Sequence, residues 1–319
     1  MNRTISIIGA GRVGKTLGKR LRVRGWRIGA VVTRSPATAR AAVRTIGGGA
    51  PCVASARDPF EKPSRGSELQ LRHRLTSRKR ALAPEVGTLS NVFAADVILF
   101  GTPDDDLPSI ARALAQIGGA RCKGKVILHT SATLDRSALA ALARRGASTG
   151  SLHPMQAFGG KIVPNLRGVI FAVEGDAKAR HTARSMAKSL GGIPIAIATR
   201  DKPIYHAAAV MAGGSVYPVV EAGLRLLMGI GFTRARATQT LLPLVRQILD
   251  NIERMGPRAA WTGPLSRGDY AIVAKHARAL RRYPREIRQS YAALALLAGR
   301  VLAKNPAAAL KRIKRALKV

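Results

Sequence analysis

The residues best suited to chemistry stand near the N-terminus, in a glycine-rich segment that follows an apolar run. Gly9, Gly11 and Gly14 fit the G-x-G-x-x-G pattern of dinucleotide sites, and Gly9 to Thr16 also fits the G-x-x-x-x-G-K-[ST] pattern of triphosphate P-loops. In both patterns a strand turns sharply into a helix, whose free backbone N–H groups and positive dipole end attract phosphate. A phosphate-binding loop is therefore predicted at Gly9, Ala10, Gly11, Arg12, Val13 and Gly14.

The residues that follow the second expected strand distinguish these two patterns. In a dinucleotide site the residue that contacts the ribose stands about 20 positions after the last glycine, and here that position holds Arg34 between Thr33 and Ser35. An acidic residue would favour a free 2′-hydroxyl, whereas arginine with flanking hydroxyls suits a 2′-phosphate. The segment 26–34 thus predicts an NADP(H) site.

A P-loop needs a later strand that ends in an acidic residue holding magnesium. The best candidate strand, residues 97–100, runs into Gly101, Thr102 and Pro103 before any acidic residue. Lys15 and Thr16 are therefore interpreted as first-turn residues of a helix. A P-loop nucleotidase remains the alternative.

Polar residues also follow the later expected strands, where ligands of open α/β sheets bind. Thr102 and Pro103 follow residues 97–100, and Ser131 follows residues 125–129, so all three are predicted to contact the cofactor. Ser131 could instead donate to a substrate carbonyl or cap the next helix, and capping is the commoner use of serine at such a position. His153 ends the strand at 148–152 and is a candidate proton donor or acceptor, the alternative being a histidine that fixes its loop. His129 is expected to be structural.

The C-terminal half offers a second group of candidates. Lys202 and His206 are four residues apart and share one face of the expected helix, so both are predicted catalytic residues unless they only form a salt bridge and a packed ring. A polar, glycine-rich turn and the helix after it supply the predicted substrate-binding residues, which are Thr262, Arg267, Asp269 and His276. A tight helix junction is the alternative interpretation of that turn.

These residues require a particular arrangement of elements. Strand and helix patterns alternate up to about residue 199, which predicts an α/β domain with a doubly wound, Rossmann-type parallel sheet. A proline-rich, basic stretch at about 47–89 interrupts the alternation and is interpreted as a surface insertion. From residue 200 to 319 only helical patterns occur, so an all-helical domain is expected there.

Composition limits the remaining possibilities. The formal net charge is +37 in 319 residues, but aromatic residues make up only 4%, so nucleic acid is expected to bind only non-specifically if at all. No run of about 20 apolar residues occurs, and the first strand leaves no room for a signal peptide, so we expect a cytoplasmic protein with no membrane span. Cys52 and Cys122 have no metal-ligand spacing, and no metal site is predicted.

Four motifs in order resemble one family: residues 9–14, Ser151–Phe158, Tyr205–Ala209 and Thr262–Asp269. They resemble the Rossmann-like oxidoreductases whose C-terminal half is domain of unknown function 2520, which are similar to deazaflavin-dependent NADP reductases and pyrroline-carboxylate reductase. The resemblance implies an NADP-binding domain, a helical domain similar to the C-terminal domain of 6-phosphogluconate dehydrogenase, a homodimer, and an active cleft between the domains. Relatives often carry asparagine about two turns after the histidine, where this chain has Gly213 and Gly214.

Together these observations predict an NADP(H)-dependent oxidoreductase that acts on a small carbonyl or imine substrate, or on the corresponding alcohol or amine. Because the glycines would serve binding alone equally well, a non-catalytic NADP-binding protein is the second alternative.

Overall fold

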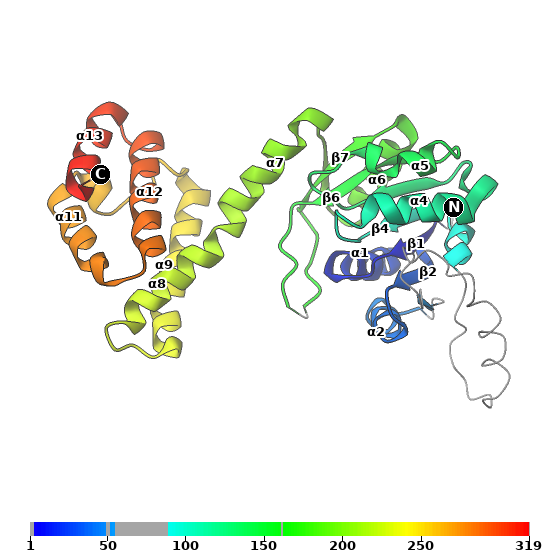
Figure 1. The fold of residues 1–319 in the computed structure, drawn as a ribbon, viewed down its shortest axis with the longest axis horizontal. Coiled ribbons are helices and arrows are strands. Elements are labelled where there is room, and N and C mark those ends of the chain that lie inside the picture. Colours follow the sequence, from blue (N-terminus) through cyan, green and yellow to red (C-terminus); the bar gives the residue numbers. More distant parts are fainter. Residues whose placement is uncertain (1–2, 49–51, 55–88, 161, 319) are drawn as a thin grey trace, which may run out of the picture. The chain divides into compact units, whose positions relative to one another are not determined.

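The computed structural model describes residues 3–48, 52–54, 89–160 and 162–318, and these divide into two compact units at Gly213 and Gly214. The N-terminal unit is built on a sheet of eight strands in the order β3-β2-β1-β4-β5-β6-β7-β8 (Figure 1). The strands are β1 (Thr4–Ile8), β2 (Arg27–Thr33), β3 (Cys52–Ala54), β4 (Val97–Phe100), β5 (Val126–His129), β6 (Ser148–Pro154), β7 (Ile170–Gly175) and β8 (Ile193–Ala196). Its helices are α1 (Arg12–Val23), α2 (Pro36–Ile46), α4 (Leu107–Gly118), α5 (Ala140–Ala143), α6 (Ala177–Ser189) and α7 (Lys202–Ala209).

The predicted doubly wound sheet is confirmed, with two differences of detail. All neighbouring strands are parallel except β6 and β7, which pair antiparallel. The expected insertion at 47–89 begins with a strand that the sequence pattern did not reveal, because β3 has only three residues; it pairs with β2 at the sheet edge. Residues 55–88 of that stretch lie outside the described part of the chain.

The C-terminal unit is helical, as expected. It contains α8 (Val216–Met228), α9 (Arg234–Met255), α10 (Pro264–Arg267), α11 (Tyr270–Ala279), α12 (Arg285–Val301) and α13 (Pro306–Leu317). A π-helical turn at Val210–Gly214 joins α7 to α8, and the 30 residues Thr199–Met228 are long and apolar enough to cross a membrane by length and composition. One such helix is a weak indication, because helices that pack against protein pass the same test.

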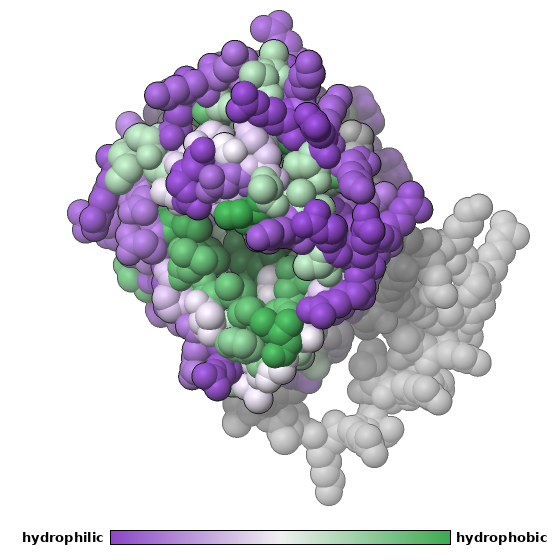
Figure 2. All heavy atoms as spheres, turned by 90° about the vertical axis from the view of Figure 1, so that its left-hand side faces the viewer, coloured by the Kyte–Doolittle hydropathy of each residue, from purple (hydrophilic) through white to green (hydrophobic). Residues whose placement is uncertain are grey.

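Apolar side chains on the C-terminal unit are incompletely covered. In Figure 2, which faces this unit, they gather in a hollow ringed by hydrophilic side chains. The largest fully buried side chains of the described residues all belong to the N-terminal unit. The small buried cluster of the C-terminal unit consists of Ala295, Ala309 and Ile313.

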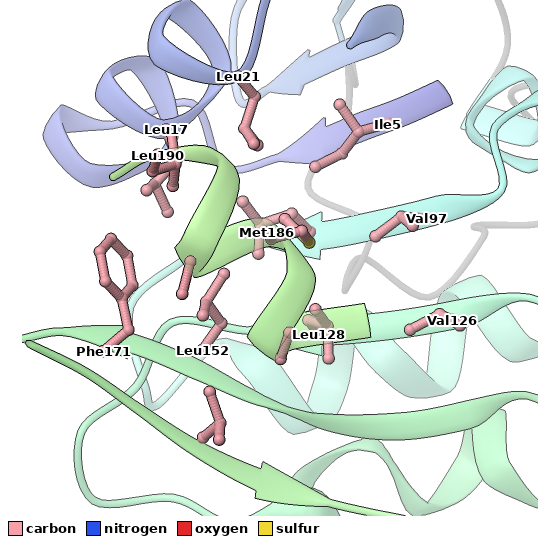
Figure 3. Packing of buried hydrophobic residues seen from close by; sticks show 14 of the residues in the cluster. Ile5, Leu17, Leu21, Val97, Val126, Leu128, Leu152, Phe171, Met186 and Leu190 are labelled. Carbon is pink, nitrogen blue, oxygen red and sulfur yellow. The ribbon is translucent and has the colours of Figure 1, made fainter. Parts of the chain in front are cut away.

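Two hydrophobic layers hold the N-terminal sheet. On one face, Leu17 and Leu21 of α1, Met186 of α6 and Leu190 just after it pack with alternate residues of the strands, among them Phe171 of β7 (Figure 3). On the opposite face, α4 and the helical turns before and after it cover the other residues of β4 and β5. The carboxyl ends of β1, β2, β4, β5 and β6 therefore share one edge, because these strands are parallel neighbours.

Candidate functional site

A cavity of about 1260 Å³ lies at this edge of the N-terminal sheet. Its wall includes most of the residues predicted to bind a cofactor, namely Gly9, Ala10, Gly11, Val13, Thr33, Arg34, Ser35, Thr102, Pro103 and Ser131. Two predicted catalytic residues, His153 and His206, also line it. The structure thus gathers residues from five strand ends and from α7 around one space.

The glycine-rich loop forms one wall of the cavity. Gly9 has a φ of +81°, and a Cβ on it would lie 2.6 Å from Thr102, so the turn requires glycine. Gly14 is buried outside the cavity wall, where a Cβ would lie 2.6 Å from the carbonyl oxygen of Gly9. A Cβ on Gly11 would meet only the carbonyl oxygen of Gly101, at 3.9 Å, so a ligand can approach the backbone there.

The N-terminus of α1 opens at this loop. Gly11 is its N-cap residue and provides no side-chain cap, and the first turn carries no acidic residue. The first N–H groups of a helix have no partner within the helix, so those of Arg12 and Val13 are suited to an anion. Arg12 contributes only its backbone in this interpretation, because its side chain is exposed and stands outside the cavity wall of the described residues.

A group of hydroxyls surrounds the end of β2. Thr38 Oγ1 lies 2.7 Å from Thr33 Oγ1 and 2.9 Å from Ser35 Oγ, and the backbone N–H of Thr38 donates to Ser35 Oγ, which caps α2. Arg34 and Lys15 line the cavity at the same end. Thr38 lines the cavity too. Lys15 and Thr38 were not predicted as ligand-binding residues, because the motif alone does not show that α1 and α2 bring them to the cavity wall.

The loops after β4 and β5 are linked by one carboxylate. Asp104 accepts hydrogen bonds from Ser131 Oγ at 2.6 Å and from Thr133 Oγ1 at 3.0 Å. Ser131 Oγ also accepts from the N–H groups of Thr133 and Leu134, so it caps this turn while facing the cavity. Both interpretations of Ser131 are therefore compatible with its position.

Three aromatic rings meet at the opposite end of the cavity. The His153 ring lies 5.8 Å from that of Tyr205 and 6.4 Å from that of His206, centroid to centroid, both nearly perpendicular. Burial, followed by the charges of His206 and Lys202, lowers the pKa of His153 to about 4. His153 Nδ1, Tyr205 OH and Thr102 Oγ1 are buried atoms with no hydrogen-bond partner among the described residues. Thr102 and His153 line the cavity, so their unpartnered atoms indicate where polar groups of a ligand would bind; Tyr205 stands outside the cavity wall of the described residues.

Lys202, the third predicted catalytic residue, does not share the cavity wall of the described residues. It is only 3% exposed and donates a hydrogen bond of 2.8 Å to Ser151 Oγ. Burial lowers its pKa, while Glu174, Asp135 and Asp104 act in the opposite direction. Ser151 and Glu174 were not singled out from the sequence, because a serine and a glutamate inside strands carry no local signal of a shared site.

The predicted substrate-binding residues belong to the C-terminal unit. Arg267 Nε donates to Asp269 Oδ2 at 3.0 Å, and His276 Nδ1 lies 2.9 Å from the Tyr291 hydroxyl. Thr262 precedes Gly263, whose φ is +96°, at the start of α10. The polar turn is thus a helix junction between α10 and α11, and a substrate role for these four residues stays a prediction.

Among the described residues, no group of three or more His, Cys, Asp or Glu side chains could hold a metal ion.

Comparisons with known proteins agree with this architecture. The Rossmann-like domain family matches residues 61–154, and the family called domain of unknown function (DUF2520) matches residues 169–298. No curated protein sequence matches the chain.

Solved structures of the same fold are distant in sequence. A candidate NADP oxidoreductase from Bacteroides fragilis is 18% identical, with a TM-score of 0.67 over 92% of this chain and 96% of that chain. A reductive aminase from Aspergillus terreus, in complex with NADPH and ethyl-5-oxohexanoate, is 14% identical, with a TM-score of 0.62 over 98% and 99%. A 1-pyrroline-5-carboxylate reductase from Streptococcus pyogenes is 15% identical, with a TM-score of 0.54 over 100% and 99%.

The resemblance seen in the four motifs is confirmed at the level of domains: the chain carries a Rossmann-like domain and a DUF2520 domain.

Proposed function

We propose that the protein is an NADP(H)-dependent oxidoreductase acting on a small carbonyl or imine substrate, or on the corresponding alcohol or amine. The observation that carries this proposal is the single cavity, which reaches from the glycine-rich loop and Arg34 to His153 and His206. One end is suited to phosphate groups and the other holds groups able to move a proton. The NADPH complex of the reductive aminase supports the choice of cofactor.

The residues at the phosphate end fit NADP(H) better than NAD(H). Gly11 leaves the backbone open, so the N–H groups of Arg12 and Val13 would hold the pyrophosphate. Arg34 and Lys15 would neutralise the 2′-phosphate, and the hydroxyls of Ser35 and Thr38 would donate hydrogen bonds to it.

The other end of the cavity would bind the reacting group. When bound, the nicotinamide would supply or accept the hydride. A His153 with a pKa of about 4 is uncharged at neutral pH, so it would hold the substrate by a hydrogen bond. His206 lines the same cavity, with its ring 6.4 Å from that of His153, and is our candidate to carry the proton.

Exchanging Arg34 for aspartate tests the cofactor assignment. The carboxylate would repel a 2′-phosphate and accept hydrogen bonds from a 2′-hydroxyl, so NADPH affinity should fall by about 100-fold while NADH affinity rises. Titration by fluorescence or calorimetry measures both. Arg40→Asp on the exposed surface of α2 is the matched control, because it makes the same charge change outside the cavity wall. Equal NADPH affinity in Arg34→Asp and wild type would contradict the assignment.

The two alternatives predict different outcomes. A P-loop nucleotidase should be stabilised in thermal melts by magnesium with ATP and be indifferent to NADPH, whereas our proposal predicts the reverse. A non-catalytic binding protein should be stabilised by NADPH yet oxidise none with a panel of small ketones, aldehydes and cyclic imines.

We also infer that two copies of the chain associate through the C-terminal unit. On α9 the side chains of Leu244, Ile248, Ile252 and Met255 recur on one face, and they are 57%, 45%, 38% and 53% exposed. A regular apolar stripe of this kind on a folded protein indicates an interface. A symmetric dimer would cover it, because each copy presents the same stripe.

A further inference from the structure

A row of polar side chains crosses three strands beneath the cavity. His129 on β5 pairs in register with Ser151 on β6, which pairs with Glu174 on β7, so all three lie side by side on one face of the sheet. His153 stands two residues after Ser151 and shares that face. Lys202, at the start of α7, donates its hydrogen bond to the middle of this row, at Ser151.

Two features of its position make the charge of Lys202 unfavourable in free energy. Its ammonium group is nearly removed from water, and it occupies the first residue of α7, where the helix dipole already carries a positive charge. Glu174 is the acidic residue placed to compensate it, being only 8% exposed and first among the groups that raise the pKa of Lys202. Glu174 is itself held in place, because its Oε2 accepts a 3.0 Å hydrogen bond from the N–H of Arg136.

The helix that begins at Lys202 carries two residues of the site. Tyr205 and His206 follow by three and four positions, so they project from the same side of α7 as Lys202. Their rings meet the His153 ring nearly perpendicularly, at interplanar angles of 88° and 81°. Fixing the first turn of α7 therefore fixes the ring of His206, which lines the cavity, and the ring of Tyr205, which packs on His153.

We propose that Lys202 is a positioning residue, whose buried ammonium group, compensated by Glu174 and bound by Ser151, places Tyr205 and His206 of α7 against His153. This deepens the proposed function, since it assigns Lys202 an indirect role and adds Glu174 and Ser151 to the site. Glu174 lies beside Ser151, which accepts the hydrogen bond of Lys202, so the two buried opposite charges are neighbours in the sheet. Buried opposite charges contribute little net stability compared with apolar residues, so their value lies in defining one arrangement.

The same ammonium group also acts on the neighbouring imidazoles. Burial is the main cause that lowers the pKa of His153, and the charges of His206 and Lys202 lower it further, whereas Asp104 raises it. His129, on β5, feels the same charge, opposed by Asp104 and Asp135. Removing the charge of Lys202 should therefore raise the pKa of His153.

A double-mutant cycle with Lys202→Met and Glu174→Gln tests the proposal. Each single change leaves one buried charge without its partner and should lower the Tm on the order of 10 °C, whereas the double variant, which buries neither charge, should lose less than either single variant. If a single variant does not fold at all, a double variant that does fold would support the proposal in the same way. Additive losses, or a double variant less stable than both singles, would overturn the proposal.

A second measurement separates positioning from a merely structural role. NMR titration of the His153 ring protons should show a higher pKa in Lys202→Met than in wild type. The matched control is Lys178→Met, which removes an exposed lysine bound to the carbonyl oxygen of Gly124. This change should alter neither the Tm nor the pKa of His153. An unchanged His153 titration in Lys202→Met would also overturn the proposal. Neither measurement needs cofactor or substrate, so a failure of the proposed function would be seen separately, as absent NADPH binding by the wild-type chain.

Discussion

The two units of the chain differ in how fully they bury their apolar side chains. In the N-terminal unit, both faces of the sheet are covered by helices, and side chains such as Phe100 and Phe171 are fully buried. In the C-terminal unit, the tightly buried positions are few and include alanines such as Ala237 and Ala295, while leucines and isoleucines of α9 and α12 stay exposed.

This difference implies two sources of stability, burial of apolar side chains within one chain and burial between two chains. Large side chains buried within one chain stabilise it at any concentration, because each removes apolar surface from water on folding. Helices that leave such side chains exposed gain the same free energy only when a partner covers them, so their stability depends on concentration. The N-terminal unit can therefore tolerate buried polar groups such as Lys202 and His129. The C-terminal unit is expected to gain part of its stability from association with a second copy.

The largest expected effect is a core truncation in the N-terminal unit. Phe171→Ala should lower the free energy of unfolding of that unit by about 3–5 kcal/mol at every protein concentration, because it leaves a cavity between α6 and the sheet. Trp26 lies in this unit and Trp261 in the other, so a Trp261→Phe background lets Trp26 fluorescence follow urea unfolding of the N-terminal unit alone. Ile248→Ala is the control and should change this transition by less than about 0.5 kcal/mol. Equal losses in the two variants would remove the distinction between the units.

A smaller effect should come from acidification, through the buried imidazoles. His129 Nδ1 lies 3.2 Å from the backbone N of Ser131, whose N–H donates to it, and Nε2 faces the carbonyl oxygen of Asp135, so the ring is held neutral; burial is the main cause that lowers its pKa to about 4. The unfolded chain, with a histidine pKa near 6.5, then binds the proton first. The stabilisation is complete above about pH 6.5 and is lost as the pH falls toward 4, at a cost of roughly 3 kcal/mol.

Urea unfolding of the N-terminal unit at pH 7.5 and pH 5 measures this loss. In His129→Asn the amide oxygen can accept from the Ser131 N–H but cannot titrate, so this variant should lose less stability than wild type between the two pH values. The same pH dependence in both proteins would show that His129 does not link proton binding to folding.

The cofactor end of the site was predictable because its signals are local. Gly9 and Gly14 stand at turns and close contacts that only glycine permits, and Arg34 follows a strand whose β-branched residues are easy to identify. The positions of Gly9 and Arg34 at the cavity could therefore be predicted from sequence spacing alone. Lys15 was missed because its role depends on how α1 and α2 pack.

The interior of the site was less predictable because it depends on strand register. Glu174 lies beside Ser151, the residue that binds Lys202, only because β6 and β7 pair antiparallel in this register, and nothing within either strand reveals its partner. The short strand β3 was missed for a related reason, since three residues carry no periodic pattern. The segment after β5 forms only a 3₁₀ turn at Arg136–Leu139, capped by Asp135, and the short helix α5.

The smallest of the three expected effects concerns the association of the C-terminal unit. Replacing Leu244 and Ile248 by glutamate places two charges on the exposed stripe of α9, where they would have to be desolvated in a dimer. The dissociation constant of the dimer should rise by about 100-fold, equivalent to about 2.7 kcal/mol, while the urea transition reported by Trp26 should not move. Sedimentation velocity over a concentration series measures the association. Gln247→Glu is the control, because it adds a charge at an exposed polar position of the same helix. A wild-type chain that stays monomeric throughout the series, or that binds lipid vesicles through this stripe, would show that the apolar residues of α9 are covered by something other than a second copy.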